Sequence, residues 1–291
     1  MLYFVTVNYH SSELVAKLLS SIQAQEISDY KLIIVNNSPI DRNITQLASA
    51  WVEIIDSPEN IGFGRACNLA LERIWQHSQK AVVWLINPDA ELAEGSIETL
   101  TDIFSTNPEI SILGTAVCDP DLKLCFCGGK FEPRTGLIAE IKTEVNDRSK
   151  ITNAPRTTDW VTGCSLILNF KHFRDIPYFD RAYFLYYEDF DFCRRYAKQG
   201  HHIYISDRIH VIHQTSSIAS RNLDLKIKYE ISSYLLSLER HTSFLVLMFR
   251  SLRIALVAIM QLFVKPKLAI SKLQGIGMYL QILRNPPKIN S

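Results

Sequence analysis

Short apolar runs alternate with amphipathic segments along the first 120 residues of the chain. Mostly apolar runs predict strands at residues 2–7, 31–35, 52–55, 81–86 and 110–117. Apolar positions at helical spacing predict helices that begin near Ser11 or Ser12, near Arg65 and near Glu94. Strands and helices that alternate through short connections form a doubly wound, mostly parallel sheet, so we predict an α/β fold.

The pattern changes after residue 119. Residues 119–159 are irregular and predict hairpins and a mobile loop, whereas 160–169 are strand-like again. From residue 188 a helix is expected whose apolar face is Phe190, Phe192, Cys193, Tyr196 and Ala197. Glu188, Asp191, Arg195 and Lys198 fall on the opposite face, which we expect to be solvated. Asp189 falls within the apolar face, so it either caps the helix or faces a cleft.

Asp89 follows the buried strand at 81–86 directly. Asn87 and Pro88 end that strand, because proline cannot donate to a ladder of hydrogen bonds. Ligands of open α/β sheets bind at the carboxyl ends of the strands, which makes Asp89 a candidate binding residue. A turn residue or a helix N-cap is the alternative interpretation.

Charge and apolar residues divide the chain into a body and a tail. The first 239 residues carry 23 basic and 30 acidic residues, a net charge of −7, whereas residues 240–291 carry eight basic residues and no acid. We expect halves at 1–118 and 119–220 within one domain of residues 1–220, followed by a helical, basic tail at 221–291. The acidic body makes nucleic acid an unexpected partner.

The tail holds a mostly apolar stretch at residues 244–264 that contains Arg250 and Arg253. These charges are costly at the centre of a bilayer, and the uninterrupted run at 254–264 is too short to span one. We therefore expect a helix that lies on an anionic membrane surface through residues 240–291. A helix packed on the body, with its arginines in water, is the alternative.

The cysteines and the first residues bear on location. The six cysteines show no CxxC pair and no density typical of a disulfide scaffold, which favours a reducing, cytoplasmic compartment. Residues 2–7 lack a basic segment before them and read as a strand rather than a signal peptide. We expect a cytoplasmic protein, peripheral on the inner face of the cytoplasmic membrane.

Seven motifs in order resemble a known family. They are VTVNY at 5–9, IVNNS at 34–38, NIGFGRACN at 60–68, LINPD at 85–89, WVTGC at 160–164, YEDFDFCR at 187–194, and His213. The chain is similar to family 2 inverting glycosyltransferases with the GT-A fold, in the rhamnosyltransferase-like branch. The resemblance covers about residues 2–215.

The resemblance implies roles for the acids. Asp189, beside Glu188, takes the place of the base that removes the acceptor's proton. Asp89 takes the place of a metal ligand for Mg²⁺ or Mn²⁺, with Asn87 where the family's motif has its first acid. His213 matches a metal-binding histidine of some relatives, and a core histidine is the alternative. An imidazole ligand favours manganese over magnesium.

The resemblance also implies a nucleotide site, with contacts from Asn8, Tyr9, Asn36, Arg65 and Asn68. Relatives carry an aspartate at the position of Asn36, and an amide offers a donor and an acceptor instead of two acceptors. Gly62 and Gly64 open a helix whose amides and Arg65 could meet phosphate, although helix packing explains the glycines as well. Trp160 and Gly163 are expected to shape the sugar pocket, with a core role for Trp160 as the alternative.

The function that follows is transfer of a sugar to a hydroxyl of a glycan or a polyprenyl-linked acceptor. Rhamnose from dTDP-rhamnose is the expected donor by branch resemblance, in polysaccharide or O-antigen biosynthesis at the cell envelope. The alternatives are another hexosyltransferase that uses a UDP-sugar, and a non-catalytic subunit that binds a partner transferase or a membrane. A dinucleotide-dependent dehydrogenase is disfavoured, because no GxGxxG follows the first strand.

Overall fold

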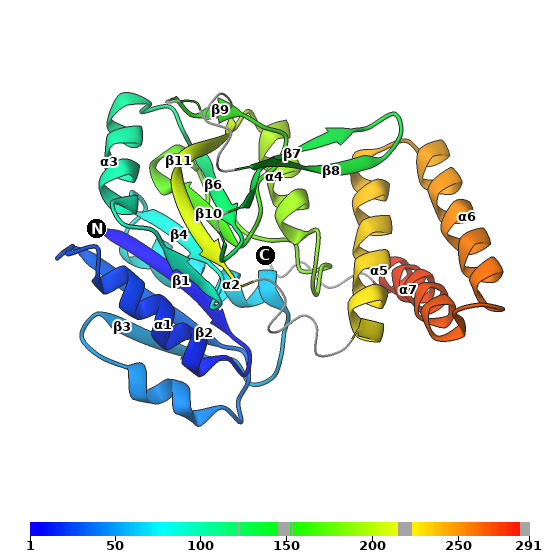
Figure 1. Cartoon of the computed structure of the whole chain (residues 1–291), viewed down its shortest axis with the longest axis horizontal. Helices are drawn as coiled ribbons and strands as arrows, with labels where there is room; N and C mark the ends of the chain where they lie inside the picture. Colours follow the sequence, from blue (N-terminus) through cyan, green and yellow to red (C-terminus); the bar gives the residue numbers. More distant parts are fainter. Residues whose placement is uncertain (122, 145–151, 153, 215–222, 286–291) are drawn as a thin grey trace.

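The computed structural model describes residues 1–121, 123–144, 152, 154–214 and 223–285. Its centre is one mixed sheet with the strand order β3-β2-β1-β4-β10-β6-β11-β5, flanked by helices on both faces (Figure 1). This architecture confirms the predicted α/β class. The predicted mobile loop falls partly on residues 145–151 and 153, which lie outside the described residues, as does Lys288 in the basic tail.

The first half of the sheet is parallel throughout. Its strands are β3 (Val52–Asp56), β2 (Tyr30–Asn36), β1 (Leu2–Asn8) and β4 (Val82–Ile86), in that spatial order. They are rich in valine and isoleucine, and most of their side chains are buried, as expected for strands covered on both faces. The four predicted strands are confirmed, and their carboxyl ends meet at one edge of the sheet.

The second half of the sheet mixes directions. Strand β10 (Ser165–Asn169) runs antiparallel between β4 and β6 (Ile112–Cys118), and β11 (Ile203–His213) then pairs in parallel with β6. Two short strands, β5 (Ala90–Leu92) and β9 (Arg156–Thr157), pair antiparallel with β11. The strand predicted at 160–169 therefore begins only at Ser165. Residues 160–164 precede β10 as a loop, and a loop at a strand end can line a site.

Four helices cover the two faces of the sheet. One apolar core lies under α1 (Ser12–Gln23) and α3 (Ser96–Thr106), and the other lies under α2 (Phe63–His77) and α4 (Glu188–Lys198). Trp84 on β4 is fully buried against Phe4, with ring centroids 5.5 Å apart. Short 3-10 turns at η1 (Arg42–Leu47) and η3 (Phe170–His172) complete the connections. The two cores fix the strand ends that carry the candidate residues.

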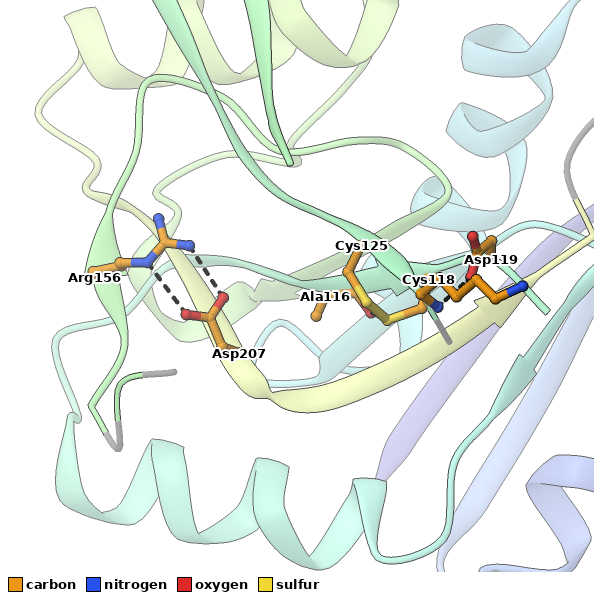
Figure 2. The surroundings of a disulfide bond; sticks show 7 residues. Ala116, Cys118, Asp119, Cys125, Arg156 and Asp207 are labelled. Carbon is orange, nitrogen blue, oxygen red and sulfur yellow. Dashed lines mark hydrogen bonds and ion pairs between the residues drawn. A yellow bond between two sulfur atoms is a disulfide. The ribbon is translucent and has the colours of Figure 1, made fainter. Parts of the chain in front are cut away.

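A long hairpin formed by β7 (Leu124–Glu132) and β8 (Leu137–Glu144) projects from β6. At its base Cys118 and Cys125 are direct partners in the strand register and form a disulfide (Figure 2). The spacing of the cysteines did not indicate this bond, which depends on the pairing of β6 with β7. The other four cysteines are free and buried. Figure 2 also shows Arg156 paired with Asp207 nearby, at 3.1 Å.

Three helices follow the sheet: α5 (Leu223–His241), α6 (Phe244–Gln261) and α7 (Pro266–Arg284). Helix α5 packs on the body through Leu235, Leu236 and Leu238, and α7 packs on α5. Gly275 allows this close contact, because a Cβ there would lie 2.8 Å from the Ile231 side chain. The outermost helix is α6, at the end of the molecule away from β1–β3 (Figure 1).

Candidate active site

A cleft of about 1220 Å³ runs along the carboxyl ends of β1 and β4, and α4, α5 and the β7–β8 hairpin enclose it. Asp89, from the turn after β4, and Asp189, from the first turn of α4, both line this cleft. The two acids are 100 residues apart in the sequence. The fold thus brings together the two side chains on which the expected chemistry depends.

Asp89 lies against His213 on the strand side of the cleft. The Asp89 Oδ1 and His213 Nε2 atoms are 3.0 Å apart, and the amide nitrogen of Asn87 lies 3.5 Å from the same ring nitrogen. Antiparallel pairing of β5 with β11 sets this geometry, because His213 is the register partner of Ala90. The register therefore positions the imidazole beside an acid that is 124 residues away in the sequence.

Charge at this pair is set by its neighbours. Burial by itself lowers the pKa of His213, but the Cys164 sulfur and the Asp89 carboxylate outweigh it and raise the pKa to about 10. Such a pKa favours the protonated ring at neutral pH, and a proton on Nε2 points to Asp89. A cation that binds this nitrogen has to displace that proton.

The donor set of this pair fits a divalent transition metal. Carboxylate oxygen and imidazole nitrogen are both ligands that Mn²⁺ accepts, whereas Mg²⁺ favours oxygen. In the described part of the chain no group of three or more His, Cys, Asp or Glu side chains forms a candidate metal cage. Asp89 and His213 would therefore hold an ion together with oxygens supplied by substrate or water.

Asp189 is fixed by backbone donors on the helix side of the cleft. Its Oδ2 accepts from the Gly163 amide at 2.7 Å, and its Oδ1 accepts from the Phe190 amide at 2.7 Å. A Cβ at Gly163 would lie 3.4 Å from the Asp189 Cβ and 3.1 Å from the Phe63 ring, so a glycine gives the loop this close approach. The loop at 160–164 thus orients the carboxylate.

Glu188 is the buried neighbour of Asp189. Burial and the negative charge of Asp189 raise the pKa of Glu188 to about 8. Burial also raises the pKa of Asp189, although the amides of Gly163 and Phe190 oppose this effect. Among the residues that the structure describes, none forms a hydrogen bond with the Oε2 atom of Glu188. A buried carboxyl that keeps its proton leaves the pair with a single negative charge, on Asp189.

The segment that precedes these acids is strained and clamped. Tyr186 and Tyr187 have φ angles of 68° and 61°, a left-handed conformation that costs bulky residues energy. The Leu185 carbonyl accepts from Ser233 of α5 at 2.8 Å, and Phe184 stacks on Tyr229 of α5 with ring centroids 4.7 Å apart. Contacts from the C-terminal helices therefore support the backbone that presents Glu188 and Asp189.

A buried charge network ties α4 to α5 one turn further along. Asp191 is fully buried and accepts from Arg195 at 2.7 Å and from His241 at 2.9 Å. Burial works against its charge, but these bonds outweigh the burial and lower the pKa of Asp191. Arg240 lies 3.7 Å from Asp191 and also pairs with Asp180. The expectation that Glu188 and Asp191 lie on a solvated face is therefore wrong, because both are buried, Glu188 beside α2 and Asp191 beneath α5.

Asn8 and Asn36 lie behind the cleft and do not line it. The Asn8 amide donates to Asn36 Oδ1 at 3.1 Å and to Asp41 Oδ2 at 3.2 Å, and the Asn36 amide donates to Asp56 at 2.9 Å. These bonds tie together the loops that follow β1, β2 and β3. Tyr9 does line the cleft, and so does Asn37, whose amide donates to Asn60 at 2.9 Å.

Arg65 and Asn68 lie outside the cleft lining. Arg65 donates to the Arg181 carbonyl at 2.7 Å, and Asn68 both donates to and accepts from the Phe179 backbone. Both side chains join α2 to the segment before α4, because that segment packs against α2. The sequence interpretation that gave them a nucleotide contact thus differs from where the fold places them.

The two glycines that open α2 serve the same packing. A Cβ at Gly62, whose φ is 86°, would lie 2.2 Å from the Phe184 carbonyl oxygen, and one at Gly64 would lie 2.8 Å from Phe179. Of the two explanations that the sequence left open, the contacts support helix packing. Gly62 and Phe63 still line the cleft, so the start of α2 borders the site.

Trp160 belongs both to the cleft and to the core. It lines the cleft, yet it is 7% exposed and packs on Phe126 and Phe190, with ring centroids 5.3 Å and 6.3 Å away. A Cβ at Gly129 would lie 2.0 Å from the indole nitrogen, which has no hydrogen-bond partner within the described part of the chain. The indole therefore forms a rigid wall beside Asp189's helix.

Sequence reasoning missed the contribution of α5 and the hairpin to the cleft. Lys226, Tyr229 and Glu230 of α5 line it, as do Glu140 and Lys142 of β8. Lys226 and Glu230 are one helical turn apart and 3.7 Å from each other. The helical spacing of these residues was visible in the sequence, but nothing in it indicated which surface they face.

Solved structures of other proteins identify the class of fold. A crystal structure of GalNAc-T7 with UDP, GalNAc and Mn²⁺ aligns with a TM-score of 0.61 and 12% identity over 82% of this chain, and the chain spans 47% of that protein. The mannosyltransferase PcManGT from Pyrobaculum calidifontis, in complex with GDP-Man and Mn²⁺, aligns with a TM-score of 0.55 and 10% identity, over 98% of this chain and 88% of that one. The fold is therefore GT-A-like, with additional C-terminal helices.

Sequence comparison then gives the family. The profile described as glycosyl transferase family 2 matches residues 3–155, more than half of the chain, and the chain belongs to that family. It is 23% identical to an N-acetylglucosaminyl-diphospho-decaprenol L-rhamnosyltransferase of Mycobacterium tuberculosis, over 82% of this chain and 84% of that protein. It is 25% identical to the rhamnosyltransferase WbbL of Escherichia coli K12, over 73% and 83% respectively. The protein is a nucleotide-sugar glycosyltransferase and a distant homologue of rhamnosyltransferases.

Proposed function

We propose that this enzyme is an inverting, metal-dependent rhamnosyltransferase that uses dTDP-rhamnose. The acceptor is a hydroxyl of a polyprenyl-diphosphate-linked sugar in the biosynthesis of a bacterial surface glycan. The observation that carries the proposal is that Asp89 and Asp189 line one cleft from different elements. The similarity to two rhamnosyltransferases, one with a lipid-linked acceptor in its name, supports the sugar and the acceptor class.

Asp189 is the base in this proposal. It accepts the proton of the acceptor hydroxyl as that oxygen forms a bond to the anomeric carbon of the donor. The bond between that carbon and the diphosphate breaks at the same time, and the electron pair leaves with the nucleoside diphosphate. The amides of Gly163 and Phe190 hold the carboxylate in place, and a protonated Glu188 leaves Asp189 as the charged member of the pair.

Asp89 and His213 bind and orient the diphosphate end of the donor, together with a divalent cation. Such a cation neutralises the charge that develops on the leaving diphosphate. Tyr9, Asn37 and the start of α2 border the part of the cleft nearest β1 and β2, where we place the nucleoside. Trp160 forms a wall for the sugar on the side of α4.

The same cleft is compatible with a second donor class. The Asn36 amide donates a hydrogen bond to Asp56, and an asparagine has no carboxylate with which to bind the pyrimidine ring of the nucleotide. The contact expected from the family's aspartate is therefore not provided by Asn36. A UDP-hexose is therefore the second candidate donor. A non-catalytic subunit is disfavoured, because the acids expected for catalysis are present and oriented by specific bonds.

A donor screen tests the proposal. The full chain is incubated with a short-chain lipid diphosphate that carries N-acetylglucosamine, and with dTDP-rhamnose, UDP-glucose or GDP-mannose. Each donor is tested with Mn²⁺, with Mg²⁺ and with a chelator, and products are read by mass spectrometry. We expect transfer from dTDP-rhamnose with metal, and an anomeric configuration by NMR opposite to that of the donor. Retained configuration, or no reaction with any donor, contradicts the proposal.

A further inference from the structure

The outer face of α6 is apolar along its whole length. Eight of its large apolar residues are between 49% and 74% exposed, namely Phe244, Leu245, Met248, Phe249, Leu252, Leu256, Ile259 and Met260. At 100° per residue they lie within an arc of about 160°, and no polar residue of α6 falls within that arc. The apolar face continues beyond the helix, where Phe263 and Val264 are 89% and 77% exposed. A patch of this size on a folded protein indicates a binding surface.

Basic residues border this outer face. Arg134 at the tip of the hairpin, with Arg250 and Arg253 of α6, lines a hollow of about 350 Å³ that also includes Leu245 and Phe249. Lys265 and Lys267 follow the helix and are exposed. From residue 240 to the end of the chain the sequence has no acid. A partner that covers this face must therefore present apolar groups flanked by negative charge.

The positions of the two ends of α6 are incompatible with a membrane-spanning α6 in this fold. By length and composition α6 could cross a bilayer, and among the described helices no other one could. Both ends, however, return to the same body. Its N-terminus follows α5 directly, while α7 begins after a short turn and packs back on α5, with Ser271 bonded to Asp224 at 3.1 Å. A helix anchored in this way lies along a surface instead of across it.

We propose that the outer face of α6 docks on the surface of an anionic phospholipid membrane. The apolar side chains enter the interface between headgroups and acyl chains, and Arg134, Arg253, Lys265 and Lys267 meet lipid phosphates at its border. Arg250 already donates to the Thr135 carbonyl and holds the hairpin beside the helix. Membrane docking is a property separate from sugar transfer. With the lipid-linked acceptor of the proposed function, docking places the enzyme on the membrane in which that acceptor resides.

Vesicle flotation of the full chain tests the docking surface. Vesicles of phosphatidylcholine alone are compared with vesicles that also contain phosphatidylglycerol. We expect flotation only with the anionic vesicles, and a marked loss at high salt because screening weakens the phosphate contacts. A full-length protein that ignores anionic vesicles overturns the proposal.

Two variants and a control locate the contact. Leu252→Glu with Leu256→Glu places two charges in the apolar face and should lower the floated fraction at least tenfold, since charge in the interface is costly. Arg253→Gln with Lys265→Gln should weaken binding to the anionic vesicles severalfold. The control is Ile40→Glu, because Ile40 is 87% exposed in the turn between β2 and η1, outside the C-terminal helices. Equal flotation of all variants contradicts the proposal.

Two further measurements separate this inference from other outcomes. Light scattering without lipid shows whether the face pairs two copies of the chain. A dimer that Leu252→Glu with Leu256→Glu disrupts, with no vesicle binding, overturns the membrane assignment in favour of self-association. Metal-dependent hydrolysis of the nucleotide-sugar in water is the readout for the proposed function. It should be unchanged in the α6 variants, so docking and catalysis can fail independently.

Discussion

The two walls of the cleft hold their acids in different ways. On the strand wall, Asp89 and His213 occupy the ends of paired strands, and backbone register fixes the distance between them. On the helix wall, Asp189 lies in the first turn of α4. The residues just before α4 include two tyrosines with left-handed backbone conformation, and a side chain of α5 bonds to this segment. The strand wall needs little beyond the sheet itself. The helix wall depends on contacts with α5, which follows α4 in the sequence and packs against it only in the tertiary fold.

This difference assigns different tasks to the walls. A pair of groups that binds a cation benefits from a rigid position, which strand register provides. A base has to exchange a proton, and burial, with a smaller contribution from the charge of Glu140, raises the pKa of Asp189 toward the range where exchange is easier. We infer that the helix wall carries the proton transfer and the strand wall carries the leaving group.

Asp189→Asn is the largest expected break. The amide keeps the shape but cannot accept the proton, so we expect turnover to fall on the order of a thousandfold while the donor still binds. Steady-state rates and isothermal titration with a donor nucleotide measure the two effects. Asp119→Asn is the matched control, since Asp119 lines the same cleft. Turnover near that of the unmodified enzyme would remove the base assignment.

Asp191→Ala tests whether α5 supports the helix wall. Removing the carboxylate leaves buried His241 without this partner and takes the ion pair from partly buried Arg195, and we expect a loss of about 3–5 kcal/mol in the free energy of unfolding. Denaturant titration measures it. Asp102→Ala breaks a more exposed pair with Arg208 and should cost no more than about 1 kcal/mol. Equal losses in both variants would mean that the network does not anchor α4.

Asp89→Asn tests the strand wall. We expect the affinity for a nucleotide with Mn²⁺ to fall by at least about 10–100-fold. Loss of a residue that only hydrogen-bonds to a metal ligand already lowers metal affinity by that factor, and Asp89 is itself the proposed ligand. The same titration with a chelator should show little difference between the variant and the unmodified protein. Asp119→Asn is the control, because Asp119 also lines the cleft. An unchanged affinity with Mn²⁺ would show that Asp89 does not bind the cation.

Glu188→Gln should change the dependence of stability on pH. The pKa of Glu188 rises from 4.5 to about 8 on folding, so between these values the unfolded chain releases a proton that the folded protein keeps. Stability then falls as pH rises through this window, with a slope on the order of 1 kcal/mol per pH unit. Denaturant midpoints measured across the window should vary less in the variant. An identical pH dependence would place the proton elsewhere.

The strand wall was largely predictable from the sequence. The apolar run of β4, followed by Asn87 and Pro88, placed Asp89 at a strand end, and the parallel strands β1 to β4 were found because buried strands read as continuous apolar runs. The helix at Glu188 was found through its apolar period. Asp189 stood out because a carboxylate falls within that apolar face.

What the sequence alone determined, then, is the parallel strands with their ends, the helix at Glu188 and the positions of the two acids, because these follow from local apolar runs and from patterns of period 3.6. Only the tertiary structure decided that Asp191 is buried, that Asn8 and Asn36 face each other instead of the cleft, and that Cys118 meets Cys125. Those facts depend on which surfaces pack together. A pattern along the chain states that a face will be covered, but it does not name the segment that covers it.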